Sequence, residues 1–296
     1  LHMHEILLTL LILKENEVVR MNSYKAIKLA LGSGGYFGFA HIGVLKVLER
    51  EGIKVEAVSG SSVGSIMAVL HAKGLSADEM EKASLEFAET LFTYRSWTSV
   101  ISNHMSEEKM MKAVEDLIWV KDFSQLKIRT FICATDLVRF KTVWFSEGDL
   151  VTAVRASIAV PGVFPALEKD GVVLADGGIL EPLPVDVFKS SDVPVVAVNL
   201  YSYDNYVAWE LPRNRVKKPV ATLMRTSDAM LWATAQRQKE FWFITIEPDL
   251  SCANDESLSV KERAAAMIKK GEEAAESALP ELEKMFQRTL PKQEGV

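Results

Sequence analysis

Short apolar runs alternate with helical patterns along most of the chain. Runs rich in β-branched and aromatic residues predict strands over seven ranges: 27–31, 55–59, 129–135, 142–145, 172–175, 193–199 and 241–247. Apolar residues spaced three and four apart predict helices over seven further ranges: 40–51, 63–73, 77–91, 107–117, 150–157, 222–239 and 260–290. This alternation predicts an α/β fold in which a central, mainly parallel sheet is flanked by helices.

The domain organisation is predicted from the continuity of this pattern. No internal repeat, low-complexity tract or long linker divides residues 21–296, so we expect one domain there. Residues 76–121 have a helical pattern with aromatic and methionine residues scattered through it. Two interpretations of this segment stay open: it forms a cap over a lipid-binding cleft, or its side chains pack in the core.

The first 20 residues stand apart from the rest. Their longest apolar run, 6–13, is too short to span a bilayer, and no cationic segment precedes it as in a signal peptide. The segment is either an N-terminal helical extension that lies on the core or on a membrane, or a set of residues foreign to the natural protein, with Met21 as its start.

Composition narrows the classes of function. The chain has 296 residues, of which 48% are hydrophobic and 25% charged, which is enough for a substantial core. The formal net charge is −6 and no dense run of Lys and Arg occurs, so nothing indicates a nucleic-acid partner. Cys133 and Cys252 lie far apart without zinc-ligand spacing or a disulfide framework, which favours a reducing, cytoplasmic location.

A candidate nucleophile follows the second predicted strand. This strand runs into Gly60-Ser61-Ser62-Val63-Gly64, and an apolar helix begins at once. The G-x-S-x-G motif requires this strand–turn–helix context, because small residues must flank a serine in so tight a turn. Ser61 offers a competing hydroxyl, but only Ser62 occupies the central position.

The candidate nucleophile needs a base, because a serine hydroxyl is a weak nucleophile at neutral pH. A conventional triad in the order Ser, Asp or Glu, His requires a histidine downstream. His104 lies downstream but in the polar stretch 102–106, so the pattern does not favour a triad. The base is therefore predicted to be a carboxylate or a lysine.

Asp176 is the strongest candidate base. It ends the apolar run 172–175 and begins Asp176-Gly177-Gly178, so it lies at the edge of the sheet where α/β proteins bind ligands. Two glycines behind it allow a sharp turn and the close approach of another backbone. On its own the tripeptide is also compatible with an ordinary Asp-Gly turn. Its occurrence together with the elbow favours the catalytic interpretation.

A glycine-rich loop, Gly32 to Gly38, separates the first strand from the first helix. Such a loop directs backbone N–H groups from a helix N-terminus toward an oxyanion or a phosphate. It is not a P-loop, because no G-K-[ST] closes it, and Phe37 takes the last glycine position of G-x-G-x-x-G. A longer dinucleotide variant on Gly32, Gly34 and Gly38 stays open on spacing.

The segment 29–45, which contains this loop, resembles the glycine-rich oxyanion segment of the bacterial patatin-like phospholipases. The elbow and the Asp-Gly-Gly tripeptide match the other two motifs of that family, in the same order. Two weaker pairs of blocks also match: 134–137 with 145–148, and 153–157 with 161–165. The resemblance runs from about Lys28 to Pro184, which is over half of the chain.

The resemblance implies a three-layer sandwich and a lipid acyl hydrolase with a Ser–Asp dyad. Ser62 would attack the ester carbonyl, Asp176 would act as base, and N–H groups of Gly34, Gly35 and Val63 would hold the oxyanion. The motif glycines that support these parts are Gly32, Gly38, Gly60, Gly64, Gly177 and Gly178. No cofactor or metal is expected. The substrate would be a lipid or fatty-acyl ester, free or at a membrane surface, and the oligomeric state stays open.

Phe37 departs from the family pattern, which usually has Arg or Lys just before the last glycine of the first motif. A cation there would support the loop or attract an anionic head group, so its absence bears on rate and on head-group preference. The departure leaves a second hypothesis open: a lipid-binding or regulatory module with little activity. His41 matches the residue usual in the family, and we expect it to pack or cap its helix.

Overall fold

The computed structural model describes residues 25–86, 88, 107–169, 171–202, 217–239 and 243–289. Their strands form one eight-stranded sheet in the order β5-β6-β3-β2-β1-β7-β8, with β4 paired to β3. The strands are β1 (Ala26–Leu31), β2 (Lys54–Ser61), β3 (Arg129–Asp136), β4 (Lys141–Phe145), β5 (Leu167–Lys169), β6 (Val172–Asp176), β7 (Val195–Val198) and β8 (Phe243–Ile246).

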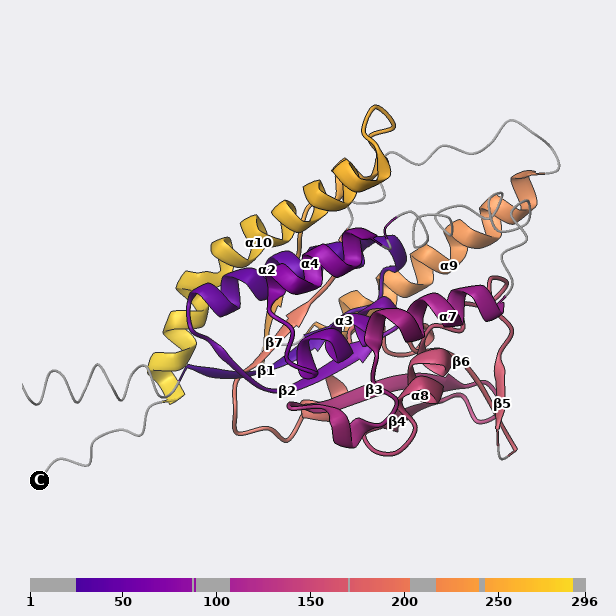
Figure 1. The fold of residues 1–296 in the computed structure, drawn as a ribbon, viewed down its shortest axis with the longest axis horizontal. Coiled ribbons are helices and arrows are strands. Elements are labelled where there is room, and N and C mark those ends of the chain that lie inside the picture. The colour runs from indigo at the N-terminus through magenta and orange to yellow at the C-terminus, as the bar shows by residue number, and fades with distance from the viewer. Residues whose placement is uncertain are drawn as a thin grey trace, which may run out of the picture.

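Seven α-helices connect or cover these strands in the described part of the chain. They are α2 (Phe39–Arg50), α3 (Val63–Ala72), α4 (Ala77–Glu86), α7 (Glu107–Ile118), α8 (Leu150–Ser157), α9 (Lys217–Gln238) and α10 (Val260–Thr289). Short 3-10 helices lie among them: η1 (Gly35–Gly38), η3 (Phe123–Gln125), η4 (Gly177–Ile179), η5 (Asp186–Phe188) and η7 (Ser251–Asn254). Figure 1 shows the helices arranged about the sheet.

The central part of the sheet is parallel. The strands β8, β7, β1, β2 and β3 pair in parallel, whereas β4 and β6 pair antiparallel to β3 and β5 pairs antiparallel to β6. Helices between successive strands provide the crossovers that parallel pairing requires. The predicted α/β fold, with a mainly parallel sheet flanked by helices, is confirmed.

The two faces of the sheet bury different clusters. Along β1, Ile27, Leu29 and Leu31 point into the large core beneath the helices, whereas Ala30 points to the opposite face. There it meets a smaller cluster from the segment 183–188, which includes η5. The period of two along a strand explains this division, because successive side chains point to opposite faces.

The long C-terminal helix α10 lies alongside α2 and α4 (Figure 1). Two glycines allow α10 to approach α2 closely. A Cβ on Gly43 would overlap the carbonyl oxygen of Ile268, and a Cβ on Gly271 would overlap that of Ala40. The backbones therefore touch in both directions, and a larger residue at either glycine would push the helices apart.

One strand was not predicted, and one helix begins earlier than predicted. The strand β5 was not predicted, because it is only three residues long and two of them, Glu168 and Lys169, are charged and exposed. Helix α9 begins at Lys217, five residues before the predicted start. Pro219 lies in its first turn, where a missing N–H removes no helical hydrogen bond.

Several predictions concern residues outside the described part of the chain. Residues 1–20 are among them, as are 87 and 89–106 within the predicted cap, so the cap and the single domain over 21–296 stay predictions. In the described residues, no helix combines the length and the apolarity needed to cross a bilayer.

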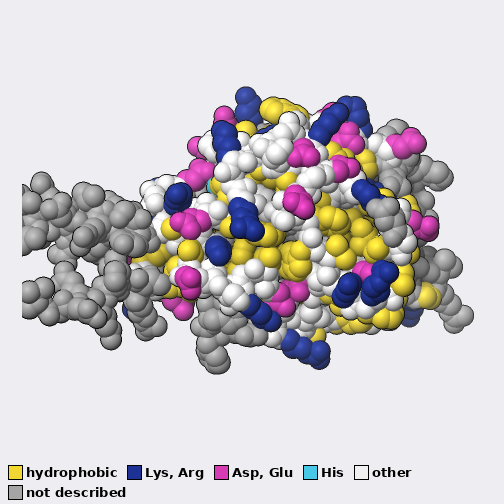
Figure 2. All heavy atoms as spheres, turned by 90° about the horizontal axis from the view of Figure 1, so that it is seen from below, with side chains coloured by type: hydrophobic (Ala, Val, Ile, Leu, Met, Phe, Trp, Pro, Cys, Tyr) yellow, Lys and Arg dark blue, Asp and Glu magenta, His cyan; other side chains and the backbone are white. Residues whose placement is uncertain are grey.

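Figure 2 shows a face on which hydrophobic side chains are exposed between charged ones.

The contact between α2 and α10 generates a first prediction. Replacing Gly with Ala inside a helix normally stabilises it by about 1 kcal/mol, but Gly271→Ala should destabilise this protein by about 2 kcal/mol, because overpacking outweighs propensity. Urea denaturation measures the difference. Ser277→Ala, on the exposed face of α10, is the matched control and should change little. A stabilised Gly271→Ala variant would contradict the close packing.

Candidate active site

The site forms where the ends of β2 and β6 meet along one edge of β3. The last pair of β2 joins Ser61 to Cys133, and the next residue of β3, Ala134, pairs with Asp176 of β6. The strand β4 occupies the other edge of β3 at both positions. Because β6 runs antiparallel to β3, its carboxyl end points toward that of β2, and the two motifs become neighbours.

Ser62 lies in a strained turn between β2 and α3. Its φ of 52° and ψ of −126° are uncommon for a residue with a side chain. Two hydrogen bonds hold the turn: the N–H of Ser62 donates to Ser157 Oγ at 2.9 Å, and Ser65 Oγ donates to the carbonyl oxygen of Ser62 at 2.6 Å. This is the geometry expected of a nucleophile elbow.

The glycines of the elbow are required by close packing. A Cβ on Gly60 would lie 2.5 Å from the carbonyl oxygen of Gly64, and a Cβ on Gly64 would overlap the carbonyl oxygen of Leu31. The turn is therefore folded tightly on itself and pressed against the end of β1. The glycine-rich loop begins at the next residue, Gly32, so the elbow and the loop are in backbone contact.

Ser62 and Asp176 are hydrogen-bonded to each other. Ser62 Oγ donates to Asp176 Oδ2 at 2.6 Å, and the N–H of Gly178 donates to Asp176 Oδ1 at 2.7 Å. Thr135 Oγ1 donates to the main-chain oxygen of Asp176 at 2.9 Å, which fixes the end of β6. Both residues of the dyad are buried, and each is only 6% exposed.

The buried carboxyl of Asp176 is a weaker acid than an exposed one. Burial raises its pKa to about 6, although the hydrogen bonds from Ser62 and Gly178 act in the opposite direction. Such a carboxyl is mostly ionised at neutral pH and is more basic there than an exposed carboxylate. That combination suits a general base.

Hydrogen bonds hold the first two residues of the glycine-rich loop in place. The N–H of Gly32 donates to Val198 O at 3.0 Å, and the N–H of Ser33 donates to Pro182 O at 2.9 Å. His41 in α2 lies 2.9 Å from the carbonyl oxygen of Gly32 through Nε2. Burial lowers the pKa of His41 to about 4, so the ring is neutral and Nε2 donates. His41 thus packs in its helix and also anchors the loop.

The candidate oxyanion donors come from this loop and from the elbow. Among the described residues, the N–H groups of Gly34, Gly35 and Val63 have no hydrogen-bond acceptor. A Cβ on Gly38 would overlap the Val63 side chain, so the loop lies directly on the elbow. Gly35 has a φ of 56°, a left-handed conformation that favours glycine.

The glycines after Asp176 fit this arrangement as well. A Cβ on Gly177 would overlap the carbonyl oxygen of Cys133, and one on Gly178 would lie 2.6 Å from Ser33 Oγ. The Asp-Gly-Gly segment therefore packs against both β3 and the glycine-rich loop. All three motifs predicted from the sequence meet at one place.

Phe37 occupies an apolar site. Its side chain is 3% exposed, belongs to the large core and contacts the Tyr36 ring, with a centroid distance of 4.3 Å. A cation at this position would have to enter the core, where an unpaired charge is costly. The loop therefore uses aromatic packing at the position where the family usually has Arg or Lys.

The histidines do not complete a triad in the described residues. His104 lies outside them. His71 also follows Ser62 in the sequence, but it lies in the last turn of α3, whereas Ser62 precedes the first turn. Since ten helical residues span about 15 Å, His71 is too distant to act on Ser62.

Ser157 and Glu181 near the site were not predicted. Ser157 accepts the N–H of Ser62, as described above, and only the weak block 153–157 pointed to its region. Glu181 is 6% exposed, accepts a hydrogen bond from Gln238 Nε2 at 2.7 Å and lies 3.3 Å from Thr142 Oγ1. Burial raises its pKa to about 7. Its hydrogen-bond partners come from β4 and α9, which are distant in the sequence, so no sequence pattern predicts this buried carboxyl.

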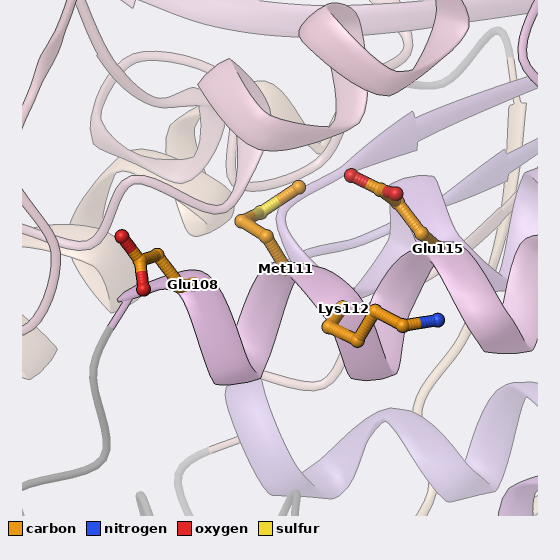
Figure 3. A pocket seen from close by; sticks show the side chains of 4 residues that line it. All are labelled: Glu108, Met111, Lys112 and Glu115. Carbon is orange, nitrogen blue, oxygen red and sulfur yellow. The ribbon is translucent and has the colours of Figure 1, made fainter.

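Other features of the described residues do not add to the dyad. They contain no group of three His, Cys, Asp or Glu side chains arranged to hold a metal ion. A hollow of about 340 Å³ lies on α7, lined by Glu108, Met111, Lys112 and Glu115 (Figure 3). It belongs to the predicted cap segment, and none of its lining residues comes from the three motifs.

A serine at a strand–turn–helix elbow, hydrogen-bonded to a carboxyl beside a glycine-rich loop, is typical of the serine hydrolase class of α/β proteins. The family model described as patatin-like phospholipase matches residues 29–189. This match covers more than half of the chain and contains all three motifs. The protein belongs to the patatin-like phospholipase family, and the glycine-rich loop is that of the family rather than a dinucleotide fingerprint.

Individual proteins are similar to this chain over part of their length. An uncharacterized NTE family protein of Mycobacterium bovis is 34% identical over 220 residues, which are 74% of this chain and 61% of that protein. Lysophospholipase NTE1 of Yarrowia lipolytica is 32% identical over 200 residues, 64% of this chain and 14% of that protein. The crystal structure of VipD from Legionella pneumophila has 14% identity and a TM-score of 0.48, over 86% of this chain and 66% of VipD. The chain thus spans less than two thirds of these relatives.

Burial of the Asp176 charge generates a prediction about stability. Because the pKa is raised in the folded state, the ionised carboxyl favours unfolding above about pH 6, and this penalty vanishes as the pH falls below the unfolded pKa near 4. Asp176→Asn should therefore raise the melting temperature at about pH 8, by the equivalent of 2 to 3 kcal/mol at most, and much less at about pH 4.

Thermal melts of the two proteins at both pH values check this expectation. The control is Ser62→Ala, which keeps the buried charge and removes one of its hydrogen-bond donors, so it should not stabilise the protein at pH 8. A gain for Asp176→Asn that is equal at both pH values would show that the charge is not the cause.

Proposed function

We propose that this protein hydrolyses carboxylic esters of lipids, with Ser62 as nucleophile and Asp176 as base. The observation that carries the proposal is the 2.6 Å hydrogen bond from Ser62 Oγ to Asp176 Oδ2 in a nucleophile elbow. Membership of the patatin-like phospholipase family supports the substrate class. The proposal covers the activity of this chain, which matches only a part of its longer relatives.

The first half of the reaction forms an acyl-enzyme. Ser62 Oγ attacks the ester carbonyl carbon while its proton passes to Asp176 Oδ2, and the carbonyl oxygen becomes an oxyanion. N–H groups of Gly34, Gly35 and Val63 stabilise that charge. The tetrahedral intermediate then expels the alcohol, which takes the proton from Asp176, and the acyl group stays on Ser62.

The second half returns the serine. A water molecule gives a proton to Asp176 and attacks the acyl carbonyl, again forming an oxyanion at the same N–H groups. Collapse of this intermediate releases the fatty acid and returns the proton from Asp176 to Ser62 Oγ. The N–H of Gly178 holds the other carboxyl oxygen throughout, so one oxygen of Asp176 stays directed at the reacting atoms.

The preferred substrate is a phospholipid or lysophospholipid. One relative, from Yarrowia lipolytica, has the name lysophospholipase. Because Phe37 is buried where the family usually has a cation, binding of an anionic head group does not depend on that position. The competing hypothesis is a lipid-binding module with little activity. It predicts little or no hydrolysis in an ester assay.

The dyad assignment predicts the kinetics of two variants. Ser62→Ala should abolish hydrolysis of a short-chain p-nitrophenyl ester and labelling by a fluorophosphonate, because the nucleophile is gone. Asp176→Asn should lower kcat about 10² to 10⁴-fold, the range for loss of a general base. Steady-state kinetics and mapping of the labelled peptide measure both effects.

Ser61→Ala is the matched control, because it removes the neighbouring hydroxyl and leaves the central position of the elbow intact. It should retain most of the activity and the label. If His104→Ala is more damaging than Asp176→Asn, or if Ser62→Ala labels at full strength, the dyad assignment is wrong.

The raised pKa of Asp176 also predicts the pH dependence. The base must be ionised, so kcat/KM should fall tenfold per pH unit as the pH drops below about 6. Glu181 is another buried carboxyl near the site, and burial raises its pKa to about 7. A pH profile of Glu181→Gln should keep the limb near pH 6. Movement of that limb in this variant would assign it to Glu181 instead.

A further inference from the structure

The turn between β3 and β4 is apolar and exposed. Among the described residues, seven large hydrophobic side chains are exposed, and three of them lie in the four-residue tip 137–140. Phe140 is 80% exposed, Val138 55% and Leu137 38%. Large apolar groups gathered at the end of a hairpin are typical of a surface that meets another apolar phase.

This tip is held in one conformation. The carboxyl of Asp136 is almost fully buried and accepts hydrogen bonds from the N–H groups of Val138 and Arg139, at 2.9 and 3.1 Å. Its second oxygen pairs with the Arg139 side chain at 3.0 Å. These three contacts fix the turn from within, so the apolar side chains are exposed by a well-supported backbone and not by a loose loop.

Phe140 is an unfavourable choice for its backbone position. Its φ is 51°, in the left-handed region where glycine and asparagine are favoured and a bulky residue is an outlier. A strained aromatic residue that is also exposed gains little from the fold itself. Such local conflicts occur at functional positions.

The tip follows the carboxyl end of β3, the same end of the sheet at which the dyad lies. Asp136, which ends β3, pairs with Leu174, two positions from the pair of Ala134 with Asp176. Arg139 and Lys141 alternate with the apolar side chains of the tip. Although the chain has a net charge of −6, this turn places Lys141, and Arg139 in its ion pair with Asp136, beside its apolar groups. Cationic and apolar side chains together match an anionic lipid surface.

We propose that the tip 137–140 inserts Val138 and Phe140 into an anionic lipid surface and thereby brings the dyad to its substrate. The inference rests on the proposed function for its purpose, but the binding step does not need catalysis. Arg139 and Lys141 contact the lipid head groups, and the Phe140 ring enters the apolar layer beneath them.

The test measures binding with the full chain carrying Ser62→Ala, which leaves the lipid intact. Cosedimentation is performed with vesicles of phosphatidylcholine alone and of phosphatidylcholine with phosphatidylglycerol. We expect stronger binding to the anionic vesicles, weakened by salt. Phe140→Asn should reduce binding at least tenfold, and its melting temperature should rise, because asparagine suits a φ of 51° better than phenylalanine.

Trp119→Asn is the matched control. Trp119 is also an exposed aromatic residue at positive φ, with 73% exposure and a φ of 58°, and it contacts Lys73 at the far end of α3. This variant removes a similar apolar area and relieves a similar strain away from the dyad. It should bind vesicles like the parent. Equal losses in the two variants, or none in Phe140→Asn, would overturn the proposal.

Two further measurements separate the alternatives. With Ser62 restored, Phe140→Asn should keep its rate on a soluble p-nitrophenyl ester and lose most of its rate on vesicle phospholipid. Loss of both rates would overturn the docking role. Size-exclusion chromatography of the Ser62→Ala parent and Phe140→Asn should show one common state, since a dimer lost with Phe140 would make the tip a protein interface. If no ester is hydrolysed but the vesicle results hold, only the proposed function fails.

Discussion

The candidate site depends on one geometric constraint, the meeting of two strand ends along a shared edge. The strand β2 stops at the pair of Ser61 with Cys133, and β6 arrives from the opposite direction to pair Asp176 with Ala134. Neighbouring strands lie about 4.8 Å from their common partner, so the residue after β2 and the last residue of β6 are brought within hydrogen-bond distance. Backbone pairing, not side-chain affinity, places the dyad.

The site combines several unfavourable features that the rest of the fold compensates. Ser62 adopts a strained backbone conformation, and the Asp176 carboxyl is removed from water. The Ser157 hydroxyl and the tight glycine contacts hold the Ser62 turn in place. Hydrogen bonds from Gly178 and Thr135 hold Asp176. Functional groups in proteins are often kept in such states by surrounding structure.

Much of the fold and the main site residues could be predicted from the sequence, because both rest on local patterns. Period and composition predicted most strands and helices, and the three motifs have fixed spacing. The short strand β5 could not be found this way, since three residues give no period. Glu181 and Ser157 were missed because their partners come from distant segments, and His71 can be set aside only when the direction of α3 is known.

The last helix has a consequence for how this chain is assembled. The family match ends at residue 189, yet β7, β8 and α10 lie beyond it, and α10 is packed backbone to backbone on α2, the helix that carries His41. The segment that the family model matches is therefore not a self-sufficient module in this chain. Residues 29–189 transplanted alone into another chain would leave the β1 edge of the sheet unpaired and α2 uncovered. A functional transplant would therefore have to include the C-terminal helix or a substitute with a glycine at the crossing.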